Sequence, residues 1–451
     1  MECHAARTLI RRSIMLGFSL GFSIGKAKNM AQISSNAFAV RILPSVPAAK
    51  VPAWVPPPGF FADVPMLNNP QDVTPAIYSR NGVDSVVMDN PFRVWGGSAI
   101  LRDFSPLGAQ VYYSGGHEAS PTRANPQFSL ICDFSTLLWS TGNVPLQSNA
   151  ANSFVNGYAA DGTPGCPHTY LGLQEVPAAW GGGPRGSLAS FFWAGSSIEN
   201  RINLLDVSQP TMGYSVLATL QPENIEPTKI RFHPSKGGGD YPITVMDQAR
   251  QGWWVATTGS AAYTLFIDRR GLIKQYPALG GNLQNGAMVL CGSLNLLMTI
   301  DGGYRSGFYA SQAPRTLHIR DLSTNVVTKS ITLGDVPSIH AGYDGSLASF
   351  HRPDVMGLQW VEELGCVVGL DQSVVPPVVV KLIPPASNPA TAQWTWSVVQ
   401  TLKHWPQDQG GQTELQSVMN NYWSKFRWVP TLQAFVVGTG KDRKPQVIRL
   451  A

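Results

Sequence analysis

The chain has 451 residues, of which 43% are hydrophobic and only 14% are charged, and its formal net charge is +5. So small a positive excess, without a long run of Lys or Arg, argues against a nucleic-acid-binding groove. No apolar stretch beyond the N-terminus is long enough to cross a bilayer as a helix, which excludes a membrane-spanning domain of that kind. The 44 Gly and 35 Pro favour turn-rich β structure.

Residues 1–29 have two interpretations. Arg11 and Arg12 precede an apolar run, as in a secretory signal peptide, and Ala27 is a small residue suited to a cleavage point. Alternatively, Met30 starts the chain and the residues before it are a misassigned extension. The first interpretation predicts a periplasmic or extracellular protein, and the second a virion or cytoplasmic one.

Residues 30–80 are predicted to form an extended arm. Prolines recur from Pro44 to Pro75 and disfavour a helix there. Two apolar segments of the arm, 36–43 and 60–67, have the composition of a β-strand.

A pattern repeats along residues 81–451: an apolar run, a short gap with polar, Gly or Pro residues, and a second apolar run closed by a glycine. Short runs rich in Val, Ile, Phe and Trp that flank a turn predict β-hairpins. The second copy carries a Gly-rich insertion, 180–187, which precedes no helix and is therefore interpreted as part of a hairpin rather than a phosphate-binding loop. The copies lie at 98–116, 168–195, 241–259, 285–302, 355–371 and 424–440.

A second hairpin follows most copies, and its first strand ends at an aspartate. A carboxylate at this place is expected to accept hydrogen bonds from backbone N–H groups two residues on and so to fix the turn. The aspartates are Asp133, Asp206, Asp268 and Asp321. The fifth copy has Pro384 and Pro385 at this turn instead, and the sixth has only one further strand before the C-terminus.

Four strands per copy predict an all-β protein, a six-bladed β-propeller of four-stranded antiparallel blades. Since the sixth copy lacks its outer strand, a strand from the N-terminal arm is expected to close the last blade and cover its edge. Segment 36–43 is the preferred closing strand, and 60–67 is the alternative.

The first copy resembles a kelch repeat, because Gly115 and Gly116 follow the second strand and Trp139 ends the segment DFSTLLW. Over residues 95–451 the set is similar to the kelch and galactose-oxidase-like propeller superfamily. The resemblance implies the fold more strongly than a function, since propellers include enzymes, lectins and scaffolds. The copper site of galactose-oxidase-like enzymes needs two His and two Tyr, with a Cys beside one Tyr. This chain has these residue types, but no Tyr and His are adjacent in sequence and Tyr170 has no Cys near it other than Cys166, which argues against a copper oxidase.

In a propeller, the turns within hairpins lie on one face, and the connections between second and third strands and between blades lie on the other. The second face is expected to hold a binding site, because long loops on a rigid scaffold commonly do. The ligand-binding candidates in these connections are His117, Glu118, Arg123, His168, Tyr170, His233, Arg305, His340, His351 and Arg352. His117 and His168 are also weak metal-ligand candidates.

Buried roles are expected for other conspicuous residues. Cys132, Cys291 and Cys366 lie in apolar runs typical of buried thiols, and Trp193, Trp253, Trp254, Trp360 and Trp428 are expected to pack between blades.

Two functions are compatible with these features. One is a non-catalytic binding or structural propeller that recognises a glycan or a protein, as a possible subunit of a larger assembly such as a virion. The alternative is an extracytoplasmic carbohydrate-active enzyme, of oxidase, lyase or hydrolase type, with its site in the central funnel. No catalytic residue is assigned and no cofactor is expected.

Overall fold

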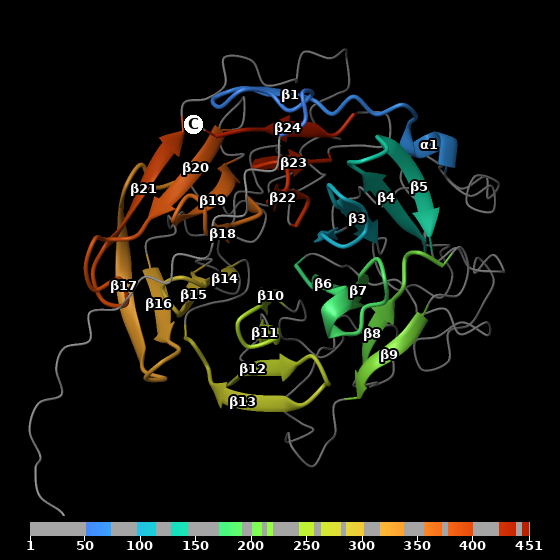
Figure 1. Cartoon of the computed structure of the whole chain (residues 1–451). Helices are drawn as coiled ribbons and strands as arrows, with labels where there is room; N and C mark the ends of the chain where they lie inside the picture. The colour runs from blue at the N-terminus through green and yellow to red at the C-terminus, as the bar shows by residue number, and fades with distance from the viewer. Residues whose placement is uncertain are drawn as a thin grey trace, which may run out of the picture. The chain divides into compact units, whose positions relative to one another are not determined.

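The computed structural model describes most of the predicted strands (Figure 1). Its described residues are 51–73, 97–113, 128–142, 171–191, 201–209, 214–219, 243–256, 263–280, 286–301, 316–337, 356–371, 378–399, 424–438 and 444–450. The chain divides into two units, Met1–Leu43 and Pro44–Ala451, and every described residue belongs to the second.

The second unit is all-β, with strands β1 to β24 and, among the described residues, a single α-helix, α1 (Pro70–Val73). No helix in the described ranges has the length and apolar content needed to cross a membrane. The strands form six four-stranded antiparallel arrays, which we number 1 to 6 in chain order. In copies 1 to 5 both hairpins therefore lie within one array, as the repeat predicts.

Arrays 1 to 3 are separate sheets. Array 1 contains β2 (Gly97–Leu101), β3 (Ala109–Tyr113), β4 (Ser129–Asp133) and β5 (Leu138–Gly142). Array 2 contains β6 (Leu173–Val176), β7 (Ser187–Ser190), β8 (Arg201–Leu205) and β9 (Tyr214–Thr219). Array 3 contains β10 (Ile243–Asp247), β11 (Gly252–Ala256), β12 (Tyr263–Asp268) and β13 (Ile273–Pro277). The Gly-rich insertion joins β6 to β7 through a short 3₁₀ turn, Ala178–Trp180, which confirms its place in a hairpin.

Arrays 4 to 6 follow the same plan. Array 4 contains β14 (Ala287–Cys291), β15 (Leu296–Ile300), β16 (Thr316–Asp321) and β17 (Val327–Gly334). Array 5 contains β18 (Gln359–Val361), β19 (Cys366–Asp371), β20 (Val378–Ile383) and β21 (Trp394–Val399). Array 6 contains β22 (Phe426–Val429), β23 (Ala434–Val437), β24 (Gln446–Ile448) and β1 (Phe61–Asp63).

Arrays 4 and 5 are joined into one eight-stranded sheet, which the repeat did not predict. Their outer strands, β17 and β21, pair in parallel from Thr332 and Trp394 to Gly334 and Trp396. Gly334 has a φ of +80°, and a Cβ there would lie 2.3 Å from the Trp396 carbonyl oxygen, so this close approach requires glycine. The joint lies beside the Pro-containing turn at which the fifth copy departs from the pattern.

The turn aspartates have the predicted structural role. The backbone N–H two residues on donates to the Oδ1 of each, at 2.9 Å for Asp133, 3.0 Å for Asp206, 2.8 Å for Asp268 and 2.7 Å for Asp321. Each carboxylate therefore satisfies an N–H group that the strand ladder leaves free.

The closing strand comes from the alternative segment, and the preference for 36–43 was wrong. The edge of β24 pairs with β1, with Phe61 opposite Ile448 and Asp63 opposite Gln446. Residues 36–43 lie outside the described part of the chain. The reason is core packing: Val64, just after β1, is fully buried with residues of arrays 1 and 6, which fixes this segment beside β24.

Apolar cores separate consecutive arrays, and the arm is part of one of them. Val55, Val64 and Met66 pack with residues of arrays 1 and 6. The arm then continues along β5, where Asn68 accepts from the Trp139 N–H at 2.7 Å and donates to the Trp139 carbonyl at 3.0 Å. The arm thus holds the last array against the first.

The expected buried side chains in the described residues are largely confirmed. Trp253 and Trp254 are adjacent in β11 yet serve different cores, the first between arrays 2 and 3 and the second between arrays 3 and 4. Trp360 and Trp428 are half-buried and pack against cores. Cys132, Cys291 and Cys366 are buried free thiols, and burial raises the pKa of each.

The role of the arm in the core can be tested at two adjacent residues. Met66 is 6% exposed and Leu67 is 73% exposed. We expect Met66→Ala to lower the free energy of unfolding by about 2–5 kcal/mol, because it leaves a cavity. The matched control Leu67→Ala should change it by less than about 0.5 kcal/mol. Urea unfolding followed by tryptophan fluorescence measures both, and equal effects would contradict this placement of the arm.

Candidate functional site

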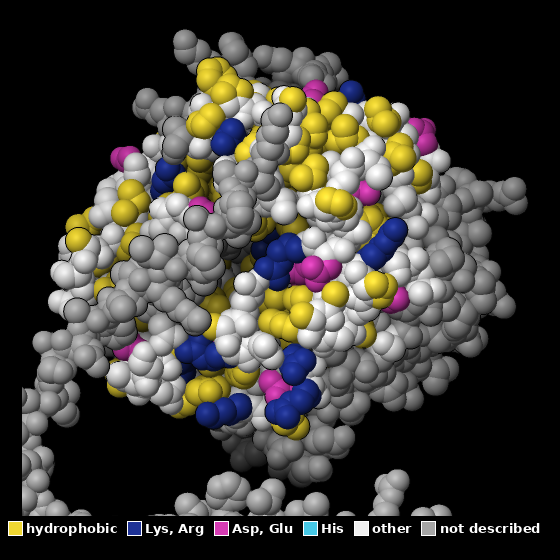
Figure 2. Space-filling model, viewed as in Figure 1, with side chains coloured by type: hydrophobic (Ala, Val, Ile, Leu, Met, Phe, Trp, Pro, Cys, Tyr) yellow, Lys and Arg dark blue, Asp and Glu magenta, His cyan; other side chains and the backbone are white. Residues whose placement is uncertain are grey.

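The first strands of the arrays lie side by side in a closed order (Figure 1). Each of β2, β6, β10, β14 and β18 contacts the first strand of the next array, and β22 contacts β2. Figure 2 shows basic and acidic side chains beside a hollow in the middle of the face viewed. The half-buried residues of these strands are therefore the candidates for a central site.

Two positions recur at the centre of each first strand. The penultimate residue of the first strand packs toward the preceding array, as Met246 of β10 and Trp428 of β22 do. The residue before it faces the following array, as Gln174 does by donating to the Thr244 carbonyl at 2.8 Å. Gln359 occupies the same position in β18, where it donates to the Phe426 carbonyl and accepts from the Trp428 N–H, both at 2.9 Å. Glutamine here joins neighbouring first strands that have no ladder between them.

Arg102 of array 1 contacts side chains of arrays 2 and 3. It follows β2, and its Nε donates to Glu175 Oε2 at 2.6 Å, while its backbone N–H donates to Glu175 Oε1 at 2.6 Å. Its Nη2 lies 3.7 Å from the Met246 sulfur, and the guanidinium also donates to the amide oxygen of Gln248. Arg102 therefore ties arrays 1, 2 and 3 together.

Glu175 is a buried carboxylate, with 4% of its surface exposed. Removal from water raises the pKa of Glu175 above its ordinary value, and the bonds to Arg102 offset part of this rise. A buried ion pair of this kind contributes little net stability, but its members become costly when separated.

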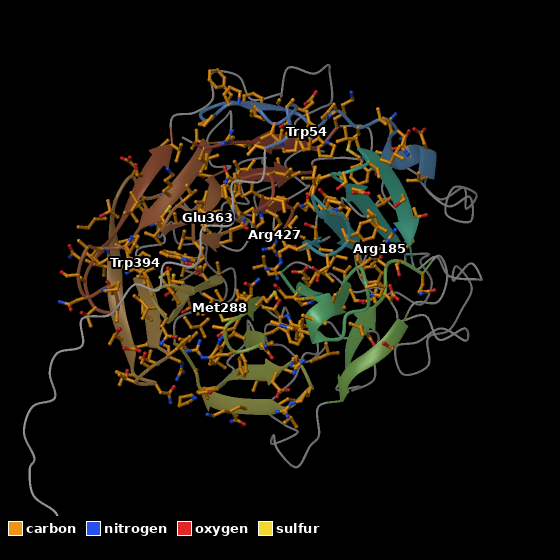
Figure 3. The ribbon with its side chains drawn as sticks, viewed as in Figure 1. Trp54, Arg185, Met288, Glu363, Trp394 and Arg427 are labelled. Atoms are coloured by element: carbon orange, nitrogen blue, oxygen red, sulfur yellow. The ribbon has the colours of Figure 1, made fainter. Side chains whose placement is uncertain are left out.

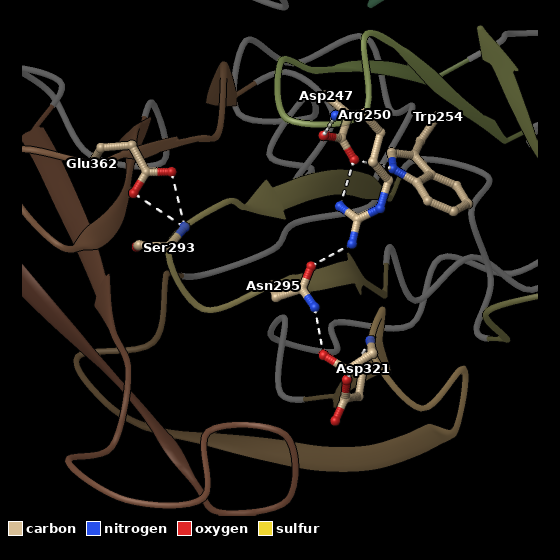
Figure 4. A network of polar contacts seen from close by, with 8 residues as sticks. Asp247, Arg250, Trp254, Ser293, Asn295, Asp321 and Glu362 are labelled. Atoms are coloured by element: carbon tan, nitrogen blue, oxygen red, sulfur yellow. Dashed lines mark hydrogen bonds and ion pairs between the residues drawn. The ribbon is translucent and has the colours of Figure 1, made fainter. Parts of the chain in front are cut away.

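The hairpin turns of arrays 3, 4 and 5 are joined by a second polar network (Figure 4). Arg250 pairs with Asp247 at 2.9 Å and donates to the Asn295 side chain in the next turn. Asn295 in turn donates to Ser323 at 2.6 Å. The Glu362 carboxylate accepts from the Ser293 N–H at 3.1 Å, which links array 5 to array 4.

Arrays 6 and 1 are joined by a buried polar contact between residues 326 positions apart. The Ser98 N–H donates to the Ser424 hydroxyl at 2.7 Å, and the Ser98 hydroxyl donates to the Ser424 carbonyl at 2.6 Å. Gln110 donates to the Lys425 carbonyl at 2.7 Å. Burial lowers the pKa of Lys425, whose side chain is fully buried, well below its usual value.

Arg427 lies at the same joint, and Figure 3 places it at the centre of the described arrays. It occupies the repeat position that holds Gln359 in β18. Its Nη2 approaches the Ser98 carbonyl at 3.5 Å, and its buried Nε has no hydrogen-bond partner. Burial lowers the pKa of Arg427 to about 10, so the guanidinium remains charged at neutral pH.

The site residues predicted from sequence all lie outside the described part of the chain. These are His117, Glu118, Arg123, His168, Tyr170, His233, Arg305, His340, His351 and Arg352. The described ranges contain no group of three or more His, Cys, Asp or Glu residues that could hold a metal ion. Sequence reasoning missed Arg102, Glu175 and Arg427, although each is a charged residue within or beside an apolar run.

The comparisons with known proteins leave the family open. No protein-family model matches this chain, and no curated protein is similar to it.

The Arg102–Glu175 pair gives a pH-dependent prediction. We expect Arg102→Met to lower the free energy of unfolding at pH 7.5 by about 3 kcal/mol, because it leaves a buried carboxylate without its cation. Loss of the guanidinium raises the pKa of Glu175 further above its value in the unfolded chain. In the folded variant, Glu175 therefore takes up a proton as the pH falls. The difference in free energy of unfolding between wild type and variant should then become smaller toward pH 5.

Arg270→Met is the control for this effect. Arg270 is 70% exposed and pairs with Asp268, so its loss should cost less than about 1 kcal/mol. Chemical denaturation of the three proteins at pH 7.5 and pH 5 provides the comparison. If the loss of unfolding free energy in Arg102→Met is the same or larger at pH 5, Arg102 does not act as the cation for the buried Glu175 carboxylate.

Proposed function

We propose that the arrays form a six-bladed β-propeller of the kelch-like kind, with the last blade closed by β1. The closed order of the first strands supports this proposal, since β22 contacts β2 as well as β18. The apolar cores between consecutive arrays support it too. In this arrangement the parallel contact between β17 and β21 is an additional link between blades 4 and 5.

The strand order supports the expectation that the connections holding the predicted site residues share one end of the arrays. In a four-stranded meander, the two hairpin turns lie at one end, and the connection from the second to the third strand lies at the other. Every predicted site residue belongs to a connection of this second kind or to one that joins two arrays. Because these long connections share one end of the arrays, they can together form a binding surface.

We infer that the protein is a non-catalytic binding or structural module that recognises a glycan or a protein through these connections. The observation that carries this inference is the use of charged side chains at the hairpin-turn end. The Arg102–Glu175, Arg250–Asp247 and Arg270–Asp268 pairs fix turns or join arrays. The hairpin-turn end of the arrays thus serves as a scaffold, and we assign ligand recognition to the opposite end. A role as a subunit of a larger assembly, such as a virion, is compatible with the long arm.

A binding assay with matched variants tests this function. Labelled protein is applied to a glycan array, and we expect a defined subset of glycans to bind. Combined substitution of His117→Ala and His168→Ala should weaken that binding at least tenfold, whereas Arg270→Ala, at the hairpin-turn end, should not change it. Equal binding by all three proteins would contradict recognition through the long connections.

Metal analysis of the purified protein separates this function from the carbohydrate-active enzyme. The binding module predicts less than stoichiometric metal and no turnover of the bound glycan. One bound metal ion per chain, lost together with glycan turnover in the His117→Ala and His168→Ala variant, would favour the enzyme. Self-association without glycan binding would favour the structural version of the proposal.

A further inference from the structure

The guanidinium of Arg427 has fewer polar partners than those of four other described arginines, Arg102, Arg250, Arg270 and Arg320. Arg102, Arg250 and Arg270 each pair with a carboxylate at 2.6 to 2.9 Å. Arg320 is buried without a carboxylate, but it donates to the Pro277 carbonyl and to Asn325, and it lies 5.5 Å from the centre of the Tyr276 ring. Arg427 has only the 3.5 Å contact with Ser98. Its charge is the least satisfied of these five.

The joint between arrays 6 and 1 does not need this arginine. Glutamine at the equivalent position bridges first strands in arrays 2 and 5. Between arrays 6 and 1, Ser98, Ser424 and Gln110 already make the bridging bonds. Burying a cation whose single hydrogen bond is long and whose Nε has no acceptor is unfavourable, so this guanidinium costs stability that a neutral residue would not.

Further hydrogen-bond donors without partners occur on the same strands. The indole Nε1 atoms of Trp360 and Trp428 are buried and have no acceptor, like the Nε of Arg427. Gln359 holds β18 and β22 together between them. Trp360 packs toward array 4 and Trp428 toward array 5, whereas Arg427 faces array 1, so these indoles do not share a site with the guanidinium. The buried Nε of Arg427 is the unsatisfied donor that favours negative charge at the joint of arrays 6 and 1.

We propose that Arg427 binds an anionic group of a small ligand, a carboxylate or a sulfate, at the centre of the arrays. Both groups accept two parallel hydrogen bonds from a guanidinium, which supplies the acceptors that Arg427 lacks. Arg427 as a whole residue is half-buried, whereas its Nε atom is buried. This site lies on the first strands and is independent of the proposed recognition through the long connections.

The test compares Arg427→Gln with wild type in the full chain. Glutamine is the residue that this repeat position already carries in arrays 2 and 5, so the variant should fold. Isothermal titration with sulfate and, separately, with glucuronate should give saturable binding to wild type that weakens at least tenfold in Arg427→Gln. Arg270→Gln should bind as wild type does. The two titrants distinguish a sulfate from a carboxylate ligand.

Thermal unfolding provides a second measurement. At constant ionic strength, the preferred anion should raise the melting temperature of wild type but not of Arg427→Gln. Without the anion, the variant should melt at or above the wild-type temperature. The proposal is wrong if neither anion binds wild type, if both proteins bind equally, or if Arg427→Gln alone lowers the melting temperature by several degrees, because the guanidinium would then be structural.

Discussion

The contact between the last array and the first is the constraint on which the rest of this structure depends. Each array buries its two faces against neighbours, so the first and last would each leave one apolar face in water unless they meet. Ser98 and Ser424 make that contact through two short hydrogen bonds, and Val64 and Met66 of the arm fill the core beside it. The arm also adds β1 to the edge of β24, which removes an exposed edge.

Polar side chains perform the same task elsewhere, because neighbouring first strands have no ladder between them. Gln174, Gln359 and the Arg102–Glu175 pair each bond one array to the next. Arg427 breaks this pattern. It occupies a bridging position, yet it makes one long contact, which is why we assign it to a ligand rather than to the scaffold.

The sequence predicted the local structure well because hairpins are specified by nearby residues. Alternating apolar runs and turn residues located both hairpins of arrays 1 to 5, and the aspartates at Asp133, Asp206, Asp268 and Asp321 were correctly interpreted as turn caps. The closing strand was harder. Segments 36–43 and 60–67 have similar compositions, and the burial of Val64 against arrays 1 and 6 is a long-range fact.

The parallel pairing of β17 with β21 and the central arginines were not predictable for the same reason. Nothing near Gly334 in sequence shows that Trp396 lies beside it. Likewise, Arg102 and Glu175 are separated by 73 residues, so their pairing emerges only when the arrays are placed together. The residues proposed for recognition, such as His117 and His168, remain predictions from the sequence.

Closure between the first and last arrays can be measured by a cross-link. In a background where Cys3 and Cys166 are replaced by serine, Ser98→Cys and Ser424→Cys are combined and the folded protein is mildly oxidised. The account predicts an intramolecular disulfide, seen as faster migration without reductant and as a higher melting temperature. Failure to form this disulfide in the native protein, with free thiols recovered at both positions, would contradict the closed arrangement.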